Sequence, residues 1–275
     1  MQVVIRNFIK LLSAGAFNSN IEIEEMSEFK WKQLLYIAKI NKVDDIITSG
    51  IVYLENSSDI IIPSKIEEQI NKNIFNNKTN VTSFAYNYKQ SKNNIKKFSN
   101  PYLNKKLNKI IFEEVHCIDT SIDSLTFLTR SIDNVNNLLS AQSYLRDLIL
   151  YGIYLRECGN KIDFIKIDRW FNVLKMKKIM NLISQYLISY FYFETDEIPF
   201  YKMEGKNVNT KIKLPFNTTL NQHEDTVETQ NESNGLIYNI PKPNTSMFKY
   251  FSYFPIETLS IFCSNIFRSL SNIEE

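Results

Sequence analysis

Apolar residues recur at three- and four-residue steps along most of this chain, a spacing that places them on one face of a helix. Residues 145–200 show this spacing most clearly, in three successive runs. The first run is expected to end near Gly159, since glycine readily adopts the left-handed conformation that closes a helix. Asp163 is placed to cap the second helix, and Pro199 is placed to end the third. We therefore predict a module of three short helices packed on one another.

The same spacing elsewhere predicts further amphipathic helices. Asp44 and Asp45 would complement the positive end of one helix, and Ser121 would cap another. Asn100-Pro101 would divide a long polar stretch between two more. These helices are predicted over residues 1–17, 28–40, 43–54, 63–75, 122–139 and 256–270.

Composition agrees with a helical fold. The 275 residues are 44% hydrophobic, enough to bury a core, and include only six glycines and seven prolines. Sheets and barrels need those two residue types at their turns. We expect a mainly α protein, an irregular multi-helix bundle with at most a small β-hairpin near residues 211–240, in which residues 211–214 would pair with residues 236–240.

Four parts are expected along the chain. An N-terminal helical region spans residues 1–140 and includes lysine-rich helices at residues 69–112. The three-helix module covers residues 141–203. A polar insert that is expected to be flexible follows at residues 204–246, and a C-terminal docking helix at residues 247–275.

The lysine-rich stretch is a candidate nucleic-acid surface. Residues 69–112 contain no acidic side chain but many lysines, interleaved with aromatic residues. Lysines offer charge to phosphates, and aromatic rings stack on bases. The net charge of only +2 favours the alternative, a solvated polar helix with a buried aromatic stripe. The candidate nucleic-acid contacts are Lys89, Lys92, Lys96, Lys97, Lys105 and Lys106.

Catalytic chemistry has little support in the residues. His116 adjoins Cys117, but neighbours on a helix diverge by about 100°, so this pair is not a catalytic dyad. The only other histidine is His223, and the chain has no glycine-rich phosphate loop. The three cysteines lack metal-binding spacing and fit a reducing cytoplasm. We therefore expect no catalytic residue, no metal site and no cofactor.

The start of the chain bears on its location. Arg6 with a short apolar run is a feature of signal peptides, but Asn7 and Lys10 interrupt that run and favour a helix. No apolar run approaches the roughly 20 residues needed to cross a bilayer. A cytoplasmic protein is the expectation.

Several motifs resemble an uncharacterised bacterial nucleotidyltransferase-like family. Residues 31–39 read W-x-x-L-L-x-x-A-K, and residues 48–51 read T-S-G-I. Residues 145–148 read L-R-x-L, and residues 159–164 read G-N-K-I-D-F. The end of the chain, with Y-F-P-I-E at residues 253–257, is also similar to that family.

The resemblance implies the helical flanks of a catalytic domain without its core. Such enzymes bind two magnesium ions with carboxylates that follow a Gly-Ser turn in an Asp-x-Asp pattern. This chain contains neither motif, and the aspartate of the family's L-R-x-L-x-D pattern falls on Leu150. The resemblance therefore implies descent without catalysis.

The resulting hypothesis is a non-catalytic protein with a binding or scaffolding role and a protein partner. The resemblance links that partner to surface-polysaccharide loci. One alternative is an active magnesium-dependent nucleotidyltransferase that uses Asp119 and Asp123. Another is nucleic-acid binding through residues 69–112.

Overall fold

A computed structural model of the chain describes residues 2–55, 62–68, 70, 97–140, 144–202, 213–218 and 245–271. These residues are mainly helical and contain no strand, which confirms the predicted fold class. The predicted hairpin near residues 211–240 lies outside the described residues except for residues 213–218, which are irregular.

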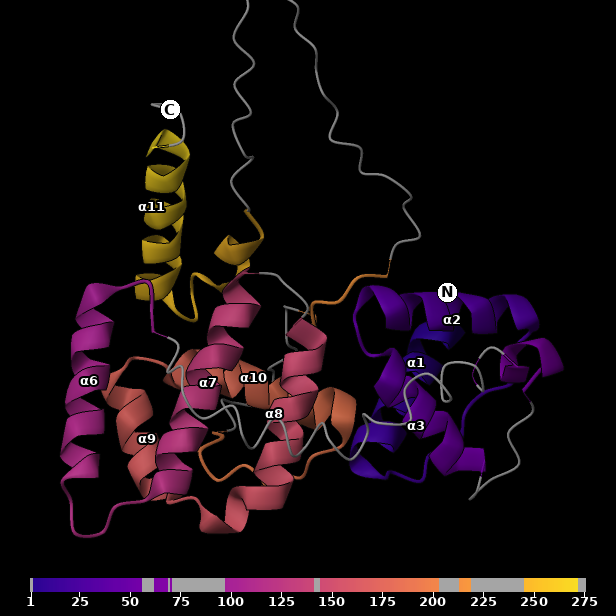
Figure 1. Cartoon of the computed structure of the whole chain (residues 1–275), viewed down its shortest axis with the longest axis horizontal. Helices are drawn as coiled ribbons and strands as arrows, with labels where there is room; N and C mark the ends of the chain where they lie inside the picture. Colours follow the sequence, from indigo (N-terminus) through magenta and orange to yellow (C-terminus); the bar gives the residue numbers. More distant parts are fainter. Residues whose placement is uncertain are drawn as a thin grey trace, which may run out of the picture.

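Three N-terminal helices pack together at one side of the molecule: α1 (Gln2–Phe17), α2 (Glu28–Ile40) and α3 (Asp44–Glu55). Figure 1 shows them as a separate group in indigo. The crossing of α1 and α3 is very close, because Gly15 and Gly50 lie against the backbone of the opposite helix. A Cβ atom on Gly50 would lie 2.1 Å from the carbonyl oxygen of Leu11, and one on Gly15 would lie 2.0 Å from that of Ile46. Only glycine fits at these two positions.

The second group contains the remaining long helices. At its outer edge lies α6 (Pro101–Val115), next to α9 (Phe164–Val173) and α7 (Ile122–Ser140), while α11 (Pro255–Ser271) rises away from the body (Figure 1). Two short 3-10 helices, η1 (Gly159–Lys161) and η2 (Thr245–Tyr250), connect longer ones. The other helices are α8 (Tyr144–Cys158) and α10 (Lys177–Phe191).

The predicted three-helix module corresponds to α8, α9 and α10. Asp163 caps α9 as predicted, since its carboxylate accepts the amide N–H groups of Ile165 and Lys166, both at 3.0 Å. Helix α8 ends at Cys158, beside Gly159 as predicted, but Gly159 is not left-handed and the chain continues into η1. The prediction that Pro199 ends the third helix is wrong. Helix α10 stops at Phe191, where Tyr192 takes the left-handed conformation with φ of 57°.

One hydrophobic core runs through both groups of helices. Phe127 of α7 lies at the centre of its aromatic part, with the ring of Tyr151 stacked 5.2 Å away. Further rings surround Phe127 at up to 6.5 Å between centroids: Tyr154, Phe164, Phe171 and Phe200. The core therefore positions α7, α8, α9 and the segment after α10 relative to one another.

Arg146 of α8 fastens the second group to the first. Its guanidinium donates two parallel hydrogen bonds to the carboxylate of Asp45, both at 2.8 Å. It also donates to the carbonyl oxygen of Lys42. The Arg146 and Asp45 side chains are only 19% and 13% exposed. The arginine of the L-R-x-L motif thus has a structural role at the start of α3.

Part of the predicted polar insert is anchored on the N-terminal helices. Asn41 and Asn217 exchange two hydrogen bonds, both of 2.9 Å. The ring of Phe216 stacks on Phe8 of α1, with centroids 5.7 Å apart. Residues 213–218 therefore belong to the packed body.

Within the described ranges, no helix combines the length and the apolar content required to cross a bilayer.

Candidate functional site

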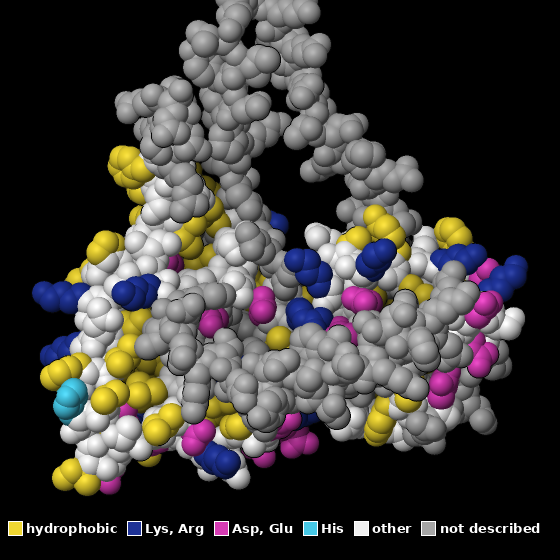
Figure 2. Space-filling view, in the orientation of Figure 1, with side chains coloured by type: hydrophobic (Ala, Val, Ile, Leu, Met, Phe, Trp, Pro, Cys, Tyr) yellow, Lys and Arg dark blue, Asp and Glu magenta, His cyan; other side chains and the backbone are white. Residues whose placement is uncertain are grey.

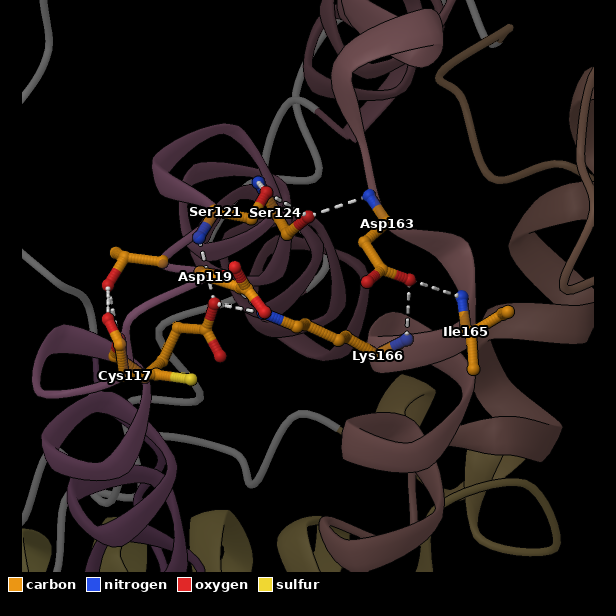
Figure 3. Close-up of polar contacts among 9 residues, drawn as sticks. Cys117, Asp119, Ser121, Ser124, Asp163, Ile165 and Lys166 are labelled. Atoms are coloured by element: carbon orange, nitrogen blue, oxygen red, sulfur yellow. Dashed lines mark hydrogen bonds and ion pairs between the residues drawn. The ribbon is translucent and has the colours of Figure 1, made fainter.

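The turn between α6 and α7 is held by a partly buried ion pair. Glu114, in the last turn of α6, accepts a hydrogen bond from Lys166 Nζ at 2.7 Å and another from the amide of Ser121 at 2.8 Å. Lys166 Nζ also donates to the carbonyl oxygen of Asp119 at 2.7 Å. Figure 3 shows the lysine reaching from α9 into this turn. The hydrogen bond to Glu114 raises the pKa of Lys166, so the lysine stays charged where it binds the turn.

Hydroxyl groups complete the fastening of the turn. Thr120 Oγ1 donates to the carbonyl oxygens of Glu114 and Cys117, at 2.8 and 2.6 Å. The Ser121 and Ser124 hydroxyls share a hydrogen bond of 2.6 Å, and Ser124 Oγ accepts the amide N–H of Asp163 at 2.8 Å (Figure 3). Backbone groups on α6, α7 and α9 are therefore tied together, and the turn is held in one conformation.

This rigid turn exposes large apolar side chains. Val115, Ile118 and Ile122 are 57%, 102% and 68% exposed. We call these three residues the corner surface. Ile165, at the start of the adjoining α9, is a further exposed apolar side chain. Figure 2 shows hydrophobic side chains gathered over the lower end of α6 and the turn that follows. Scattered single apolar residues are normal on a surface, whereas this group on a fixed turn is a candidate interaction site.

The corner surface lies in an acidic part of the chain. Residues 110–129 contain no lysine or arginine but four carboxylates: Glu113, Glu114, Asp119 and Asp123. Lys166 neutralises Glu114. Asp119 is exposed and, among the described residues, forms no ion pair. The rim of the corner surface is therefore negative.

Helix α6 also presents an exposed outer face above the corner. Tyr102, Lys105, Lys109, Phe112 and His116 recur at helical spacing on its solvent side. Tyr102 and Phe112 are 57% and 65% exposed. Glu113 lies on the same side, 3.6 Å from Lys109. We call these six residues the α6 outer face.

The structure places three of the six candidate nucleic-acid lysines, while Lys89, Lys92 and Lys96 lie outside the described residues. Lys97 is exposed just before α6, and Lys105 is exposed on the α6 outer face. Lys106 is partly engaged, since its Nζ donates to the carbonyl oxygen of Val173 at 3.1 Å and lies 4.6 Å from the Tyr102 ring centroid.

The residues considered for catalysis that the structure describes lie at or beside the turn between α6 and α7. His116 Nδ1 lies 2.7 Å from the carbonyl oxygen of Phe112, and its ring packs on that of Phe112, 4.2 Å between centroids. Asp119 lies in the turn, and Asp123 lies in the first turn of α7, where it complements the helix dipole. Nowhere in the described part of the chain do three histidine, cysteine or carboxylate side chains form a group suited to a metal ion.

Sequence reasoning missed the corner surface. Its signal was present, since Ile118 and Ile122 lie among turn-forming residues where apolar side chains are unusual. The Glu114–Lys166 pair that fixes the turn joins residues 52 positions apart and has no local signature.

Searches of protein-family models, curated proteins and solved structures found no match to the chain.

Proposed function

We propose that this chain is a non-catalytic binding protein that engages a protein partner through the corner surface. The observation that carries the proposal is the full exposure of Ile118 on a turn fixed by Glu114 and Lys166. Because the turn that carries it is already fixed, a protruding apolar side chain needs little backbone ordering on binding and suits insertion into an apolar pocket.

The negative rim specifies the charge of the partner's pocket. Asp119 and Asp123 would face lysine or arginine side chains around that pocket, because complementary charges steer association and exclude wrong partners. The same carboxylates would be repelled by an anionic lipid surface. The proposed partner is therefore a protein with an apolar pocket and a basic rim.

The proposed lineage fits this role. The motifs around Trp31 and Arg146 suggest that the helices descend from the flanks of a nucleotidyltransferase-like protein. With the catalytic residues of such a protein lost, binding is the function that remains. Protection from heat unfolding by magnesium with ATP or CTP would contradict the non-catalytic part of the proposal.

Site-specific crosslinking tests the partner site. A photoreactive phenylalanine analogue would replace Ile118 in cells, with Tyr36 of α2 as the control position. The partner captured from position 118 would then be purified and titrated against the wild type and the Ile118→Asp variant. We expect Ile118→Asp to weaken binding about tenfold or more, since it places a charge at the centre of an apolar contact.

Phe29→Asp is the matched control, because Phe29 is 66% exposed on α2, far from the turn. It is expected to bind as the wild type does. Equal crosslinking from positions 36 and 118, or unchanged affinity in Ile118→Asp, would overturn the proposal.

A further inference from the structure

The α6 outer face has a charge polarity along its length. Its first half carries Lys105 and Lys109, in a stretch of chain with no acidic residue. Its second half carries Glu113 and lies at the start of residues 110–129, which contain no lysine or arginine. One helix face is thus basic at its start and acidic at its end, with exposed aromatic rings at both ends.

A face of this kind is complementary to itself when it is turned end for end. An antiparallel approach of two copies about an axis near Lys109 brings Lys105 opposite Glu113 of the partner subunit, and the reverse. Tyr102 then lies opposite His116 of the partner subunit, and the reverse. The two Lys109 side chains meet at the axis, where the Glu113 carboxylate of the same copy, 3.6 Å away, offsets their repulsion.

We propose that the α6 outer face joins two copies of this chain into an antiparallel, two-fold dimer. The contact is isologous and closes on itself, which is the commonest symmetry of soluble oligomers. The acid at Glu113 disfavours a polyanion on this face, and a parallel pairing would place like charges together. The inference goes beyond the proposed function and does not depend on the corner surface.

The size of the face sets the expected strength. From Tyr102 to His116 the helix rises about 21 Å, so a strip about 10 Å wide buries roughly 400 Å² on each copy. The total of about 800 Å² lies below the roughly 1,000 Å² of a stable specific interface, so the contact is a weak and reversible one. We therefore expect a dissociation constant in the micromolar range rather than an obligate dimer.

The dimer would present two corner surfaces at opposite ends, because the turn after α6 lies at the far end of each helix in an antiparallel pair. Such a particle binds two partner molecules at once. This is the geometry of a scaffold, and it would raise avidity towards a clustered partner.

Charge-swap variants test the dimer by sedimentation velocity from about 1 to 100 µM, the range set by the expected interface size. Lys105→Glu places two carboxylates opposite each other, and Glu113→Lys places two lysines opposite each other. Each variant alone is expected to dimerise at least about tenfold more weakly than the wild type. An equimolar mixture restores both opposite-charge contacts and is expected to associate as the wild type does.

Lys39→Glu, at an exposed position on α2, is the control and should dimerise normally. Circular dichroism establishes that each variant is folded. A wild type that remains monomeric throughout the range, or a mixture no stronger than its components, would overturn the dimer. Salt-sensitive binding of a labelled oligothymidine by monomeric wild type would assign the face to nucleic acid instead.

Discussion

Gly50 shows how one missing side chain determines the packing of two helices. The backbone of α3 approaches α1 so closely that a Cβ atom at position 50 would overlap the carbonyl oxygen of Leu11. The contacting atom belongs to a helix backbone, which has no rotamer through which to move aside. Alanine at this position therefore requires the two helices to separate.

Gly50→Ala is expected to lower the free energy of unfolding by about 3 kcal/mol, as overpacked cores do. Urea denaturation followed by circular dichroism measures the change. Gly159→Ala is the matched control, because nothing lies within 4 Å of the Cβ position there. Similar stabilities for the two variants would contradict the close crossing.

Caps determine where the helices begin. Asn100 accepts the amide N–H groups of Tyr102 and Leu103, and Asp163 does the same for Ile165 and Lys166. Ser27 stands at the corresponding position of α2, but its side chain makes no capping hydrogen bond. Asn100 and Asp163 thus accept capping hydrogen bonds, whereas Ser27 is of a residue type that is common at N-caps but accepts none.

Asp163→Ala is expected to destabilise the protein by about 1 kcal/mol, the usual cost of a lost N-cap. Ser27→Ala should change stability by less than about half of that. Chemical denaturation of both variants under the same conditions provides the comparison. A Ser27→Ala variant as unstable as Asp163→Ala would refute this assignment of caps.

Helix α11 is attached to the start of α6 through a buried carboxylate. Glu257 is fully buried and accepts the amide N–H groups of Ser99 and Asn100, at 2.5 and 3.1 Å. Asn100 Nδ2 also donates to Ser260 Oγ at 2.8 Å. Burial raises the pKa of the Glu257 carboxyl, and the amide hydrogen bonds oppose this only in part.

The raised pKa makes the attachment sensitive to pH. A carboxyl whose pKa is higher in the folded than in the unfolded state binds more protons when folded. Its contribution to stability is therefore greatest below the unfolded pKa and is lost as pH rises through the folded pKa. The free energy of unfolding of wild type relative to Glu257→Gln should fall as pH rises from about 4 to 7. A difference that is constant, or that grows with pH, would refute this account.

Helix positions could be predicted from the sequence because amphipathic periodicity and capping residues act locally. The end of α10 could not, because residues 192–200 turn back to bury Phe193, Ile198 and Phe200, and this packing outweighs the position of Pro199. The corner surface was missed although Ile118 and Ile122 are unusual among turn-forming residues, because no periodic pattern shows that such residues are exposed. Lys97, Lys105 and Lys106 were proposed as nucleic-acid contacts, which stays a prediction, and their neighbours could not be predicted because these depend on how α6 and α9 pack.

On the scale of the whole molecule, the Arg146–Asp45 pair connects the two groups of helices. Both side chains are largely buried, so removing one partner leaves the other charge poorly solvated. The pair also positions α8 against the start of α3, which orients the N-terminal group on the core.

Arg146→Met is expected to cost about 2 kcal/mol and to increase hydrogen exchange in α1, α2 and α3 more than in α7. Mass-spectrometric exchange measured helix by helix reports this difference. Lys32→Met is the control, because the Lys32–Glu28 pair is exposed and contributes little. Uniform protection across both groups in Arg146→Met would show that the pair does not connect them.

The same pair has a consequence for biosynthesis. Gly15 and Gly50 are close in sequence, so α1 and α3 can pack while the rest of the chain is still being made. Arg146 follows Asp45 by 101 residues, and a ribosome adding about 5–20 residues per second needs roughly 5–20 seconds to supply it. During that interval the N-terminal helices exist without the arginine that later fastens them. A growing chain of this protein therefore carries N-terminal helices in which Asp45 has as yet no Arg146 to pair with.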